Sequence, residues 1–235
     1  MKISDSNSIS NPILVALDVP ARDQALSLVD RLRPHVGGFK VGLEVFCSCG
    51  PSIVEEIGAE QVFLDLKFHD IPNTVAGVSR VASRLGVLMF NVHCLGGLEM
   101  MLRAVEAARE ENTSTHVLGV TILTSHDTPG LERLGLREEP QIAVRRLALL
   151  ARESGLDGVV CSPQEAAGVR AECGADFLLV TPGIRGAQSE RGDQKRTLSA
   201  PEAIQEGANW LVVGRPITQS NDVVEAAREI AATIG

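Results

Sequence analysis

The sequence has few aromatic residues and little positive charge. Aromatic residues make up 3% of the 235 residues, and tyrosine is absent. This composition argues against a surface that stacks nucleic-acid bases, because such a surface needs aromatic side chains. The 22 Lys and Arg against 30 Asp and Glu give a formal net charge of -8. We therefore expect no nucleic-acid partner, although a local cluster of Arg and Lys can still bind a small anion.

The chain also lacks the patterns of metal ribbons, membrane spans and secretory leaders. Its five cysteines are irregularly spaced and include no C-x-x-C pair, so neither a zinc ribbon nor a thioredoxin motif is indicated. Cys47-Ser48-Cys49 could bind a metal, but thiols kept in a reducing compartment are the favoured interpretation. No run of 18 apolar residues occurs, so we expect no membrane partner. The polar first residues do not resemble a signal peptide, and we expect a cytoplasmic protein.

The sequence does contain a regular alternation of short apolar runs and helical stretches. Helical periodicity is clear over Ala21–Arg33 and Ile142–Glu153. Eight runs of four to seven residues, rich in Val, Leu and Ile, are typical of buried parallel strands. These runs are Ile13–Val19, Phe39–Gly42, Val62–Lys67, Met89–His93, Val117–Thr121, Gly158–Ser162, Phe177–Thr181 and Trp210–Gly214.

Eight strand and helix repeats predict an α/β fold, a single (β/α)8 TIM barrel. Such barrels have about 250 residues, so one domain would use residues 1–235, with residues 1–10 as a flexible tail. A doubly wound open sheet is the alternative, but no G-x-G-x-x-G follows the first run. Active sites of these barrels lie at the C-terminal ends of the strands. The polar residues at those ends are therefore the candidate site.

The clearest polar motif, D-L-K-F-H-D-I-P-N-T, spans residues 65–74 at the end of the third run. Asp65 and Lys67 are two apart, so they share one face of the strand, while the leucines on either side of Asp65 face the helices. Asp70 follows on the loop. A lysine among carboxylates keeps its proton. We therefore expect Lys67 to act as a cation and proton donor, not as a Schiff-base nucleophile.

A second polar array follows the seventh and eighth runs. T-P-G-I-R ends at Arg185, and Gly214-Arg215-Pro216 follows the last strand. These two loops often bind phosphate in such barrels, since glycine admits the ligand to backbone N–H groups and arginine offers a planar fork. Two surface arginines beside turn glycines are the alternative. The polar stretch 183–199 is long for such a loop, so we expect a lid, in which Gln194 suits a substrate amide or phosphate.

These motifs resemble those of the orotidine 5′-monophosphate (OMP) decarboxylase family, and the resemblance runs from Leu17-Asp18 to Gly214-Arg215-Pro216. It implies a homodimeric barrel with shared active sites, which converts OMP to UMP and CO2 in the last step of UMP synthesis. It also implies that no metal and no cofactor take part. One departure is Gly186, where many members carry proline. Since glycine is the freer residue, lid closure would cost more here.

The resemblance also assigns roles to individual residues. Lys40, Asp65, Lys67 and Asp70 would form the family's charged tetrad, with Asp70 supplied to the neighbouring subunit's site together with Ile71 and Thr74. Asp18 and Lys40 would bind ribose hydroxyls, and Thr124 would contact the substrate near the pyrimidine or ribose. Arg185, Gln194, Gly214 and Arg215 would form the lid and the phosphate site.

The chemistry explains why a lysine would be needed among carboxylates. Loss of CO2 from a pyrimidine ring carbon leaves an electron pair in an sp2 orbital, which the ring cannot delocalise. A fixed ammonium group at Lys67 would stabilise this carbanion and then protonate it. Asp65 would lie near the leaving carboxylate.

Two other functions remain open at this point. A metal-dependent sugar-phosphate decarboxylase or aldolase of the same barrel type also carries D-x-K-x-x-D, but the I-P-N-T and G-D-Q segments argue against it. A non-enzymatic phosphate binder would have no need of the charged tetrad. His69 and His93 could indicate a metal site, but the nearby Lys67 makes a bound cation costly.

Overall fold

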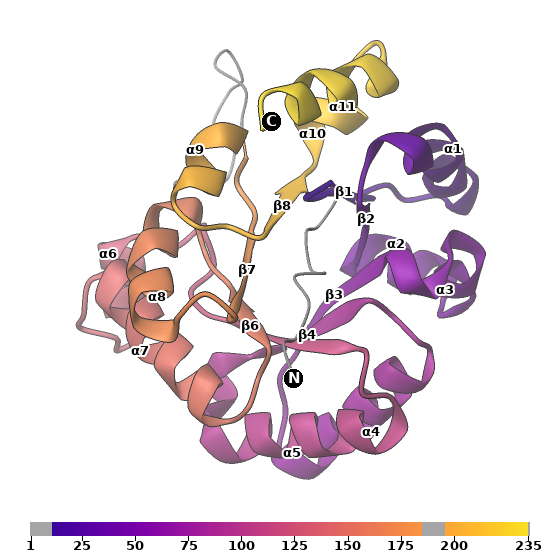
Figure 1. The fold of residues 1–235 in the computed structure, drawn as a ribbon. Coiled ribbons are helices and arrows are strands. Elements are labelled where there is room, and N and C mark those ends of the chain that lie inside the picture. The colour runs from indigo at the N-terminus through magenta and orange to yellow at the C-terminus, as the bar shows by residue number, and fades with distance from the viewer. Residues whose placement is uncertain (1–10, 185–195, 235) are drawn as a thin grey trace, which may run out of the picture.

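Eight parallel strands pair in chain order and close into a barrel (Figure 1). The computed structural model describes residues 11–184 and 196–234. The strands are β1 (Ile13–Ala16), β2 (Gly38–Gly42), β3 (Val62–Phe68), β4 (Met89–His93), β5 (His116–Val120), β6 (Gly158–Val160), β7 (Leu178–Thr181) and β8 (Trp210–Val213). Because β1 also pairs with β8, the predicted TIM barrel is confirmed and the open-sheet alternative is wrong.

Helices surround the barrel on its outer side (Figure 1). They are α1 (Arg22–Leu32), α2 (Leu43–Cys49), α3 (Ser52–Ile57), α4 (Pro72–Arg84), α5 (Gly97–Glu111), α6 (Thr128–Arg133), α7 (Pro140–Glu153), α8 (Ala166–Cys173), α9 (Ala200–Gln205), α10 (Arg215–Thr218) and α11 (Val223–Ala232). The two helices predicted from periodicity correspond to α1 and α7. Among the described residues, no helix has the length and apolar character needed to cross a membrane.

Strand alternation divides the apolar side chains into two layers. Outward residues such as Val15 and Leu64 pack against the helices in the larger cluster. Inward residues such as Leu14, Phe63 and Met89 fill the barrel interior. Towards the C-terminal ends of β2 and β3 the inward positions carry Lys40, Asp65 and Lys67, and this places charged side chains at one mouth of the barrel.

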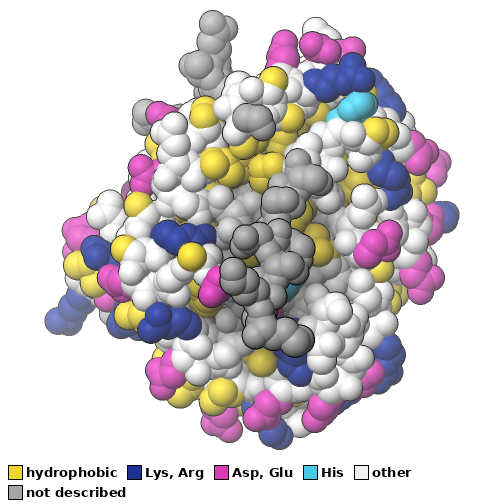
Figure 2. Space-filling view, viewed as in Figure 1, with side chains coloured by type: hydrophobic (Ala, Val, Ile, Leu, Met, Phe, Trp, Pro, Cys, Tyr) yellow, Lys and Arg dark blue, Asp and Glu magenta, His cyan; other side chains and the backbone are white. Residues whose placement is uncertain are grey.

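The outer surface carries charges of both signs. Figure 2 shows Lys and Arg side chains interspersed with Asp and Glu around the rim of helices. Several are paired, as in the 2.7 Å contact between Arg84 and Glu111 and the 2.6 Å contact between Arg80 and Glu110. Part of the positive surface charge is therefore matched by acidic partners.

Candidate active site

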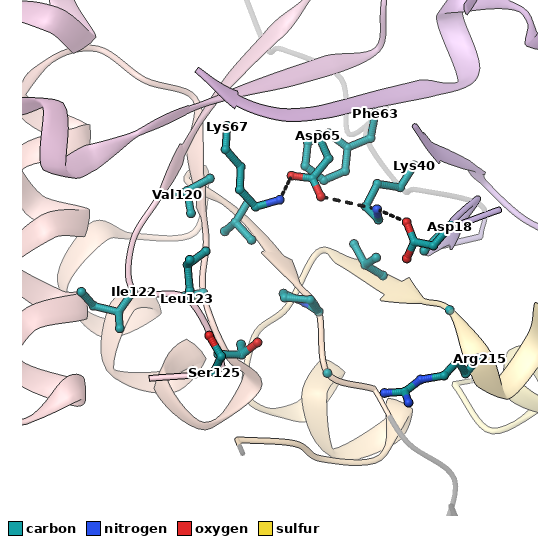
Figure 3. Close-up of a pocket in the computed structure, with 18 of the residues that line it drawn as sticks. Asp18, Lys40, Phe63, Asp65, Lys67, Val120, Ile122, Leu123, Ser125 and Arg215 are labelled. Atoms are coloured by element: carbon teal, nitrogen blue, oxygen red, sulfur yellow. Dashed lines mark hydrogen bonds and ion pairs between the residues drawn. The ribbon is translucent and has the colours of Figure 1, made fainter. Parts of the chain in front are cut away.

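A pocket of about 580 Å³ opens at the C-terminal ends of the strands. Charged side chains from β2, β3 and the loop after β1 form one side (Figure 3). Apolar side chains cover much of the rest, including Phe63, Val120, Ile122, Leu123 and Val212. An apolar wall beside charged groups excludes water and strengthens their electrostatic interactions with a bound ligand.

Four charged side chains form a continuous chain of ion pairs along the pocket (Figure 3). Lys67 Nζ lies 2.7 Å from Asp65 Oδ1, and Lys40 Nζ lies 3.5 Å from the other oxygen of Asp65. Lys40 Nζ also donates to Asp18 Oδ1 at 2.9 Å. Asp65 therefore lies between two ammonium groups. The fold brings together four predicted site residues that come from three separate segments of the chain.

Lys40 is held in its charged form. Its side chain is about a tenth exposed, and burial alone would lower its pKa. The carboxylates of Asp65 and Asp18 outweigh that effect, so the pKa of Lys40 is raised above its ordinary value. A lysine with a raised pKa is a fixed cation and a hydrogen-bond donor at neutral pH.

Lys67 lies where the pairing of β3 with β4 is irregular. Leu64 pairs with Phe90 and Phe68 pairs with Val92, so four steps along β3 correspond to two along β4. Lys67 has a φ of 52°, and it is the one non-glycine residue with positive φ in the described part of the chain. That backbone conformation costs a long side chain roughly 1–2 kcal/mol. Strain of this kind is often found at functional sites.

Two glycines make room at the pocket. A Cβ at Gly42 would lie 2.9 Å from Lys40 Nζ and 3.1 Å from Asp18 Oδ1, so a side chain there would displace the Lys40 ammonium group from its present position. Gly183 follows β7 with a φ of 87°, which favours glycine. Gly183 belongs to the T-P-G-I-R segment that the sequence pointed to, whereas nothing local marked Gly42, whose neighbours lie on β2 and on the loop after β1.

The part of the pocket away from Lys67 carries the predicted phosphate residues. Gly214 and Arg215 line it at the start of α10, and Thr124 lines it from the loop after β5. Arg215 lies apart from the ion-pair chain in Figure 3. The predicted residues Arg185 and Gln194, and the departure at Gly186, lie outside the described residues.

Three predicted residues do not line the pocket of their own chain. Asp70, Ile71 and Thr74 lie between the end of β3 and the first turn of α4, and all three are exposed. Ile71 is 67% exposed, which is high for a large apolar residue. The Asp70 carboxylate accepts from the backbone N–H of Ile71 at 2.6 Å. Among the described residues, the ion pair of Lys67 within its own chain is with Asp65, not with Asp70.

His69 and His93 stack on each other beside the site. Their ring centres lie 5.2 Å apart. Burial, together with the nearby His69 and Lys67, lowers the pKa of His93 to about 4. His93 is therefore neutral at physiological pH. In the described residues, no three side chains of the His, Cys, Asp and Glu types group as metal ligands would.

The structure adds polar residues that the sequence analysis missed. Asn91, inside β4, bonds to both Asp65 and Lys67. Glu165 and Arg196 form a buried ion pair, and Arg196 also donates to the carbonyl oxygens of Ile122 and Leu123 in the pocket wall. Asn91 could have been noticed as a polar residue inside an apolar strand. Nothing in the local sequence marked the pair of Glu165 and Arg196.

Fold and site together define a class of protein: a (β/α)8 barrel with a lysine–carboxylate chain at one side of its mouth and an arginine with a helix-start glycine at another. The model of the orotidine 5'-phosphate decarboxylase / HUMPS family matches residues 11–230, which is most of the chain. The chain belongs to this family.

Individual relatives agree with the family match. The chain is 52% identical to orotidine 5'-phosphate decarboxylase of Moorella thermoacetica, over 94% of this chain and 91% of that one. It is 53% identical to the protein of the same name from Syntrophomonas wolfei, over 93% and 95%. The solved structure of orotidine 5'-phosphate decarboxylase from Lactobacillus acidophilus is similar with a TM-score of 0.85 and 34% identity, over 96% of this chain and 99% of that one.

Proposed function

We propose that this protein is a cofactor-free carboxy-lyase that converts OMP to UMP and CO2, the last step of pyrimidine nucleotide synthesis. The observation that carries the proposal is the contact of 2.7 Å between Lys67 and Asp65 at one side of a largely apolar pocket. The names of the relatives at about 50% identity support the same substrate.

The reaction follows from the charges in the pocket. When the bond between the ring carbon and the carboxylate breaks, its electron pair stays on the ring carbon. The Lys67 ammonium group would face that pair, stabilise it while CO2 leaves and then transfer a proton to the carbon. Asp65 would hold Lys67 in place, and Lys40, charged between Asp65 and Asp18, would keep Asp65 in place in turn.

The rest of the pocket fits the remainder of the nucleotide. Arg215 and the backbone of Gly214 would bind the phosphate with Arg185 and Gln194, because a guanidinium group and N–H groups at a helix start suit a phosphate. Asp18 and Lys40 would bind the ribose hydroxyls. The pyrimidine would lie against the apolar wall, near Thr124.

We also propose a homodimer in which each site takes Asp70, Ile71 and Thr74 from the neighbouring subunit. The support is their position: each is exposed and lies outside its own pocket, and Ile71 presents an apolar side chain to solvent. A carboxylate from the neighbour would give Lys67 a second acidic contact. A cytoplasmic location is part of the proposal, and the five cysteines, all free thiols, suit a reducing compartment.

Turnover of OMP by the purified protein tests the function. The absorbance of the orotate ring should fall as UMP forms, and the rate should be the same before and after dialysis against EDTA. No fall in absorbance would refute the proposal. Loss of activity on dialysis, with recovery on adding Mg²⁺, would favour the metal-dependent enzyme of the same barrel type instead.

A further inference from the structure

Asn91 is a polar side chain inside an otherwise apolar strand. It lies between Phe90 and Val92 in β4, and its exposed fraction is 0%. Burying an amide without hydrogen-bond partners is unfavourable. The partners of this amide therefore indicate why an asparagine stands there.

The side-chain amide of Asn91 makes two hydrogen bonds to the D-L-K segment of β3, one through its nitrogen and one through its oxygen. Its Nδ2 donates to Asp65 Oδ1 at 2.6 Å, and its Oδ1 accepts from the backbone N–H of Lys67 at 2.7 Å. The same Asp65 oxygen accepts from Lys67 Nζ at 2.7 Å. The Asn91 side chain thus holds two groups in place. One is the Asp65 carboxylate, which contacts the Lys67 ammonium group, and the other is the backbone of Lys67 itself.

The second of these bonds falls where the β3–β4 ladder is interrupted. The pairing moves from Leu64–Phe90 to Phe68–Val92, and Lys67 takes its positive φ inside that interval. A strand N–H in such an irregular stretch needs a replacement acceptor. Asn91 Oδ1 supplies it, and the unfavourable backbone conformation of Lys67 is stabilised by a side chain of the neighbouring strand.

We infer that Asn91 is a positioning residue for the reaction. It fixes the direction of the Lys67 ammonium group by holding Asp65 and the Lys67 backbone in one arrangement. Asn91 need not touch the substrate, since it does not line the pocket. This inference rests on the proposed function, in which the Lys67 ammonium group must face the reacting carbon.

Asn91→Leu tests the inference, because leucine is close in size and removes both hydrogen bonds. We expect kcat for OMP to fall by about 10- to 100-fold, the loss typical of hydrogen bonds to charged groups. The Kd for UMP should change by less than about threefold, because the phosphate contacts remain. Wild-type protein run alongside separates the hypotheses: an inactive wild type refutes the function, whereas an active wild type and an equally active variant refute the inference.

Asn209→Leu is the matched control at the opposite end of the barrel. Asn209 also accepts from a strand backbone N–H, that of Leu179 at 2.8 Å, and from a charged group, Arg170 at 2.6 Å. Its loss should lower the melting temperature and leave kcat within about threefold of wild type. If both leucine variants lose kcat equally, or if Asn91→Leu loses UMP affinity as much as kcat, the inference is overturned.

Asn91→Asp covers the case in which Asn91→Leu fails to fold. The introduced carboxyl keeps the acceptor for Lys67 N–H, and when protonated it can donate to Asp65 as the amide does. When ionised it repels Asp65 and competes for the Lys67 ammonium group. The ratio of variant kcat to wild-type kcat should therefore rise as the pH is lowered from about 8 to about 5. A ratio that does not change with pH would overturn the inference.

Discussion

The two ends of the barrel use charged residues in different ways. At the C-terminal end, Lys40, Asp65 and Lys67 bind mainly one another and border an open pocket. At the N-terminal end, charged side chains bind backbone groups where the strands begin. The first arrangement leaves charge available to a ligand, whereas the second uses it within the fold.

The N-terminal end contains an arginine clamp between α5 and the starts of β5 and β6. Arg109 donates to both oxygens of Asp157 at 2.6 Å and to the carbonyl oxygen of Thr115 at 2.6 Å. Asp157 in turn accepts from the backbone N–H of Val117 at 2.6 Å. Three elements are thereby joined through groups that have little capacity left for a ligand.

The same clamp recurs around the barrel. Arg170 binds Asn209, which precedes β8 and accepts from Leu179 N–H. Arg33 binds Gln61, which precedes β3. In each case the arginine follows one strand and binds the residue just before the next strand but one. Arg109 follows β4, for example, and binds Asp157 just before β6. This repetition shows that polar residues at strand starts stabilise the fold, and it makes the different pattern at the strand ends informative.

Lys67→Ala should produce the largest difference between the two ends. Removing the cation and proton donor should lower kcat by more than about 1,000-fold, since general acid catalysis and electrostatic stabilisation are lost together. UMP binding should be largely retained, because no phosphate contact is removed. Steady-state kinetics and calorimetric titration with UMP measure the two effects.

Arg170→Ala is the control for that variant. It removes a charge from the clamp at the other end, so the melting temperature should fall while kcat is retained. A Lys67→Ala enzyme that keeps more than about a tenth of wild-type turnover would contradict the role assigned to Lys67.

Mixed dimers test whether the strand-end residues serve the neighbouring subunit. Lys67→Ala and Asp70→Ala homodimers should each be nearly inactive. Co-expression should give about half mixed dimers, in which one site carries both changes and the other neither, so activity should approach roughly a quarter of wild type. Mass spectrometry verifies that mixed dimers form. Mixed dimers as inactive as their parents would show that Asp70 serves its own chain.

The barrel and much of the site could be predicted from the sequence for two physical reasons. Strand alternation is a local pattern, so Asp65 and Lys67 could be placed on one face of a strand. The C-terminal ends of the strands in such a barrel meet at one mouth, so polar residues at those ends could be expected to lie together. The contacts of Asn91 and Gly42 depend on the register between neighbouring strands. Asn91 is marked as a polar residue inside an apolar strand, but its partners depend on the register shift between β3 and β4, which leaves no local pattern in either strand. The partners of these two residues could therefore not be predicted.

Arg215→Ala should have an intermediate effect, confined to ligands that carry a phosphate. A charge-assisted hydrogen bond of this kind contributes about 1.5–3 kcal/mol, so UMP affinity should fall by about 10- to 100-fold. Uridine affinity should barely change. Calorimetric titration of the variant with both ligands checks this, and equal losses for nucleotide and nucleoside would mean that Arg215 does not contact phosphate.

Asp157→Asn should give the smallest effect, and it should appear in stability alone. Burial would raise the pKa of Asp157, but nearby His116, the N–H of Val117 and Arg109 outweigh it, so the pKa is lowered. A carboxyl whose native pKa lies below its unfolded value of about 3.9 stabilises the fold above that pH, and the contribution disappears as the pH falls through the native pKa. We expect Asp157→Asn to lower the free energy of unfolding by about 1–3 kcal/mol at pH 7, and the difference should shrink as the pH approaches 4 and below.

Urea unfolding at fixed protein concentration measures this difference in the free energy of unfolding. Asp176→Asn is the control, since Asp176 is an exposed aspartate at the same end, and its free energy of unfolding should shift by less than about 0.5 kcal/mol. A difference that stays constant with pH would show that the charge of Asp157 does not stabilise the clamp, and a parallel loss of kcat would show that the two ends of the barrel are not independent.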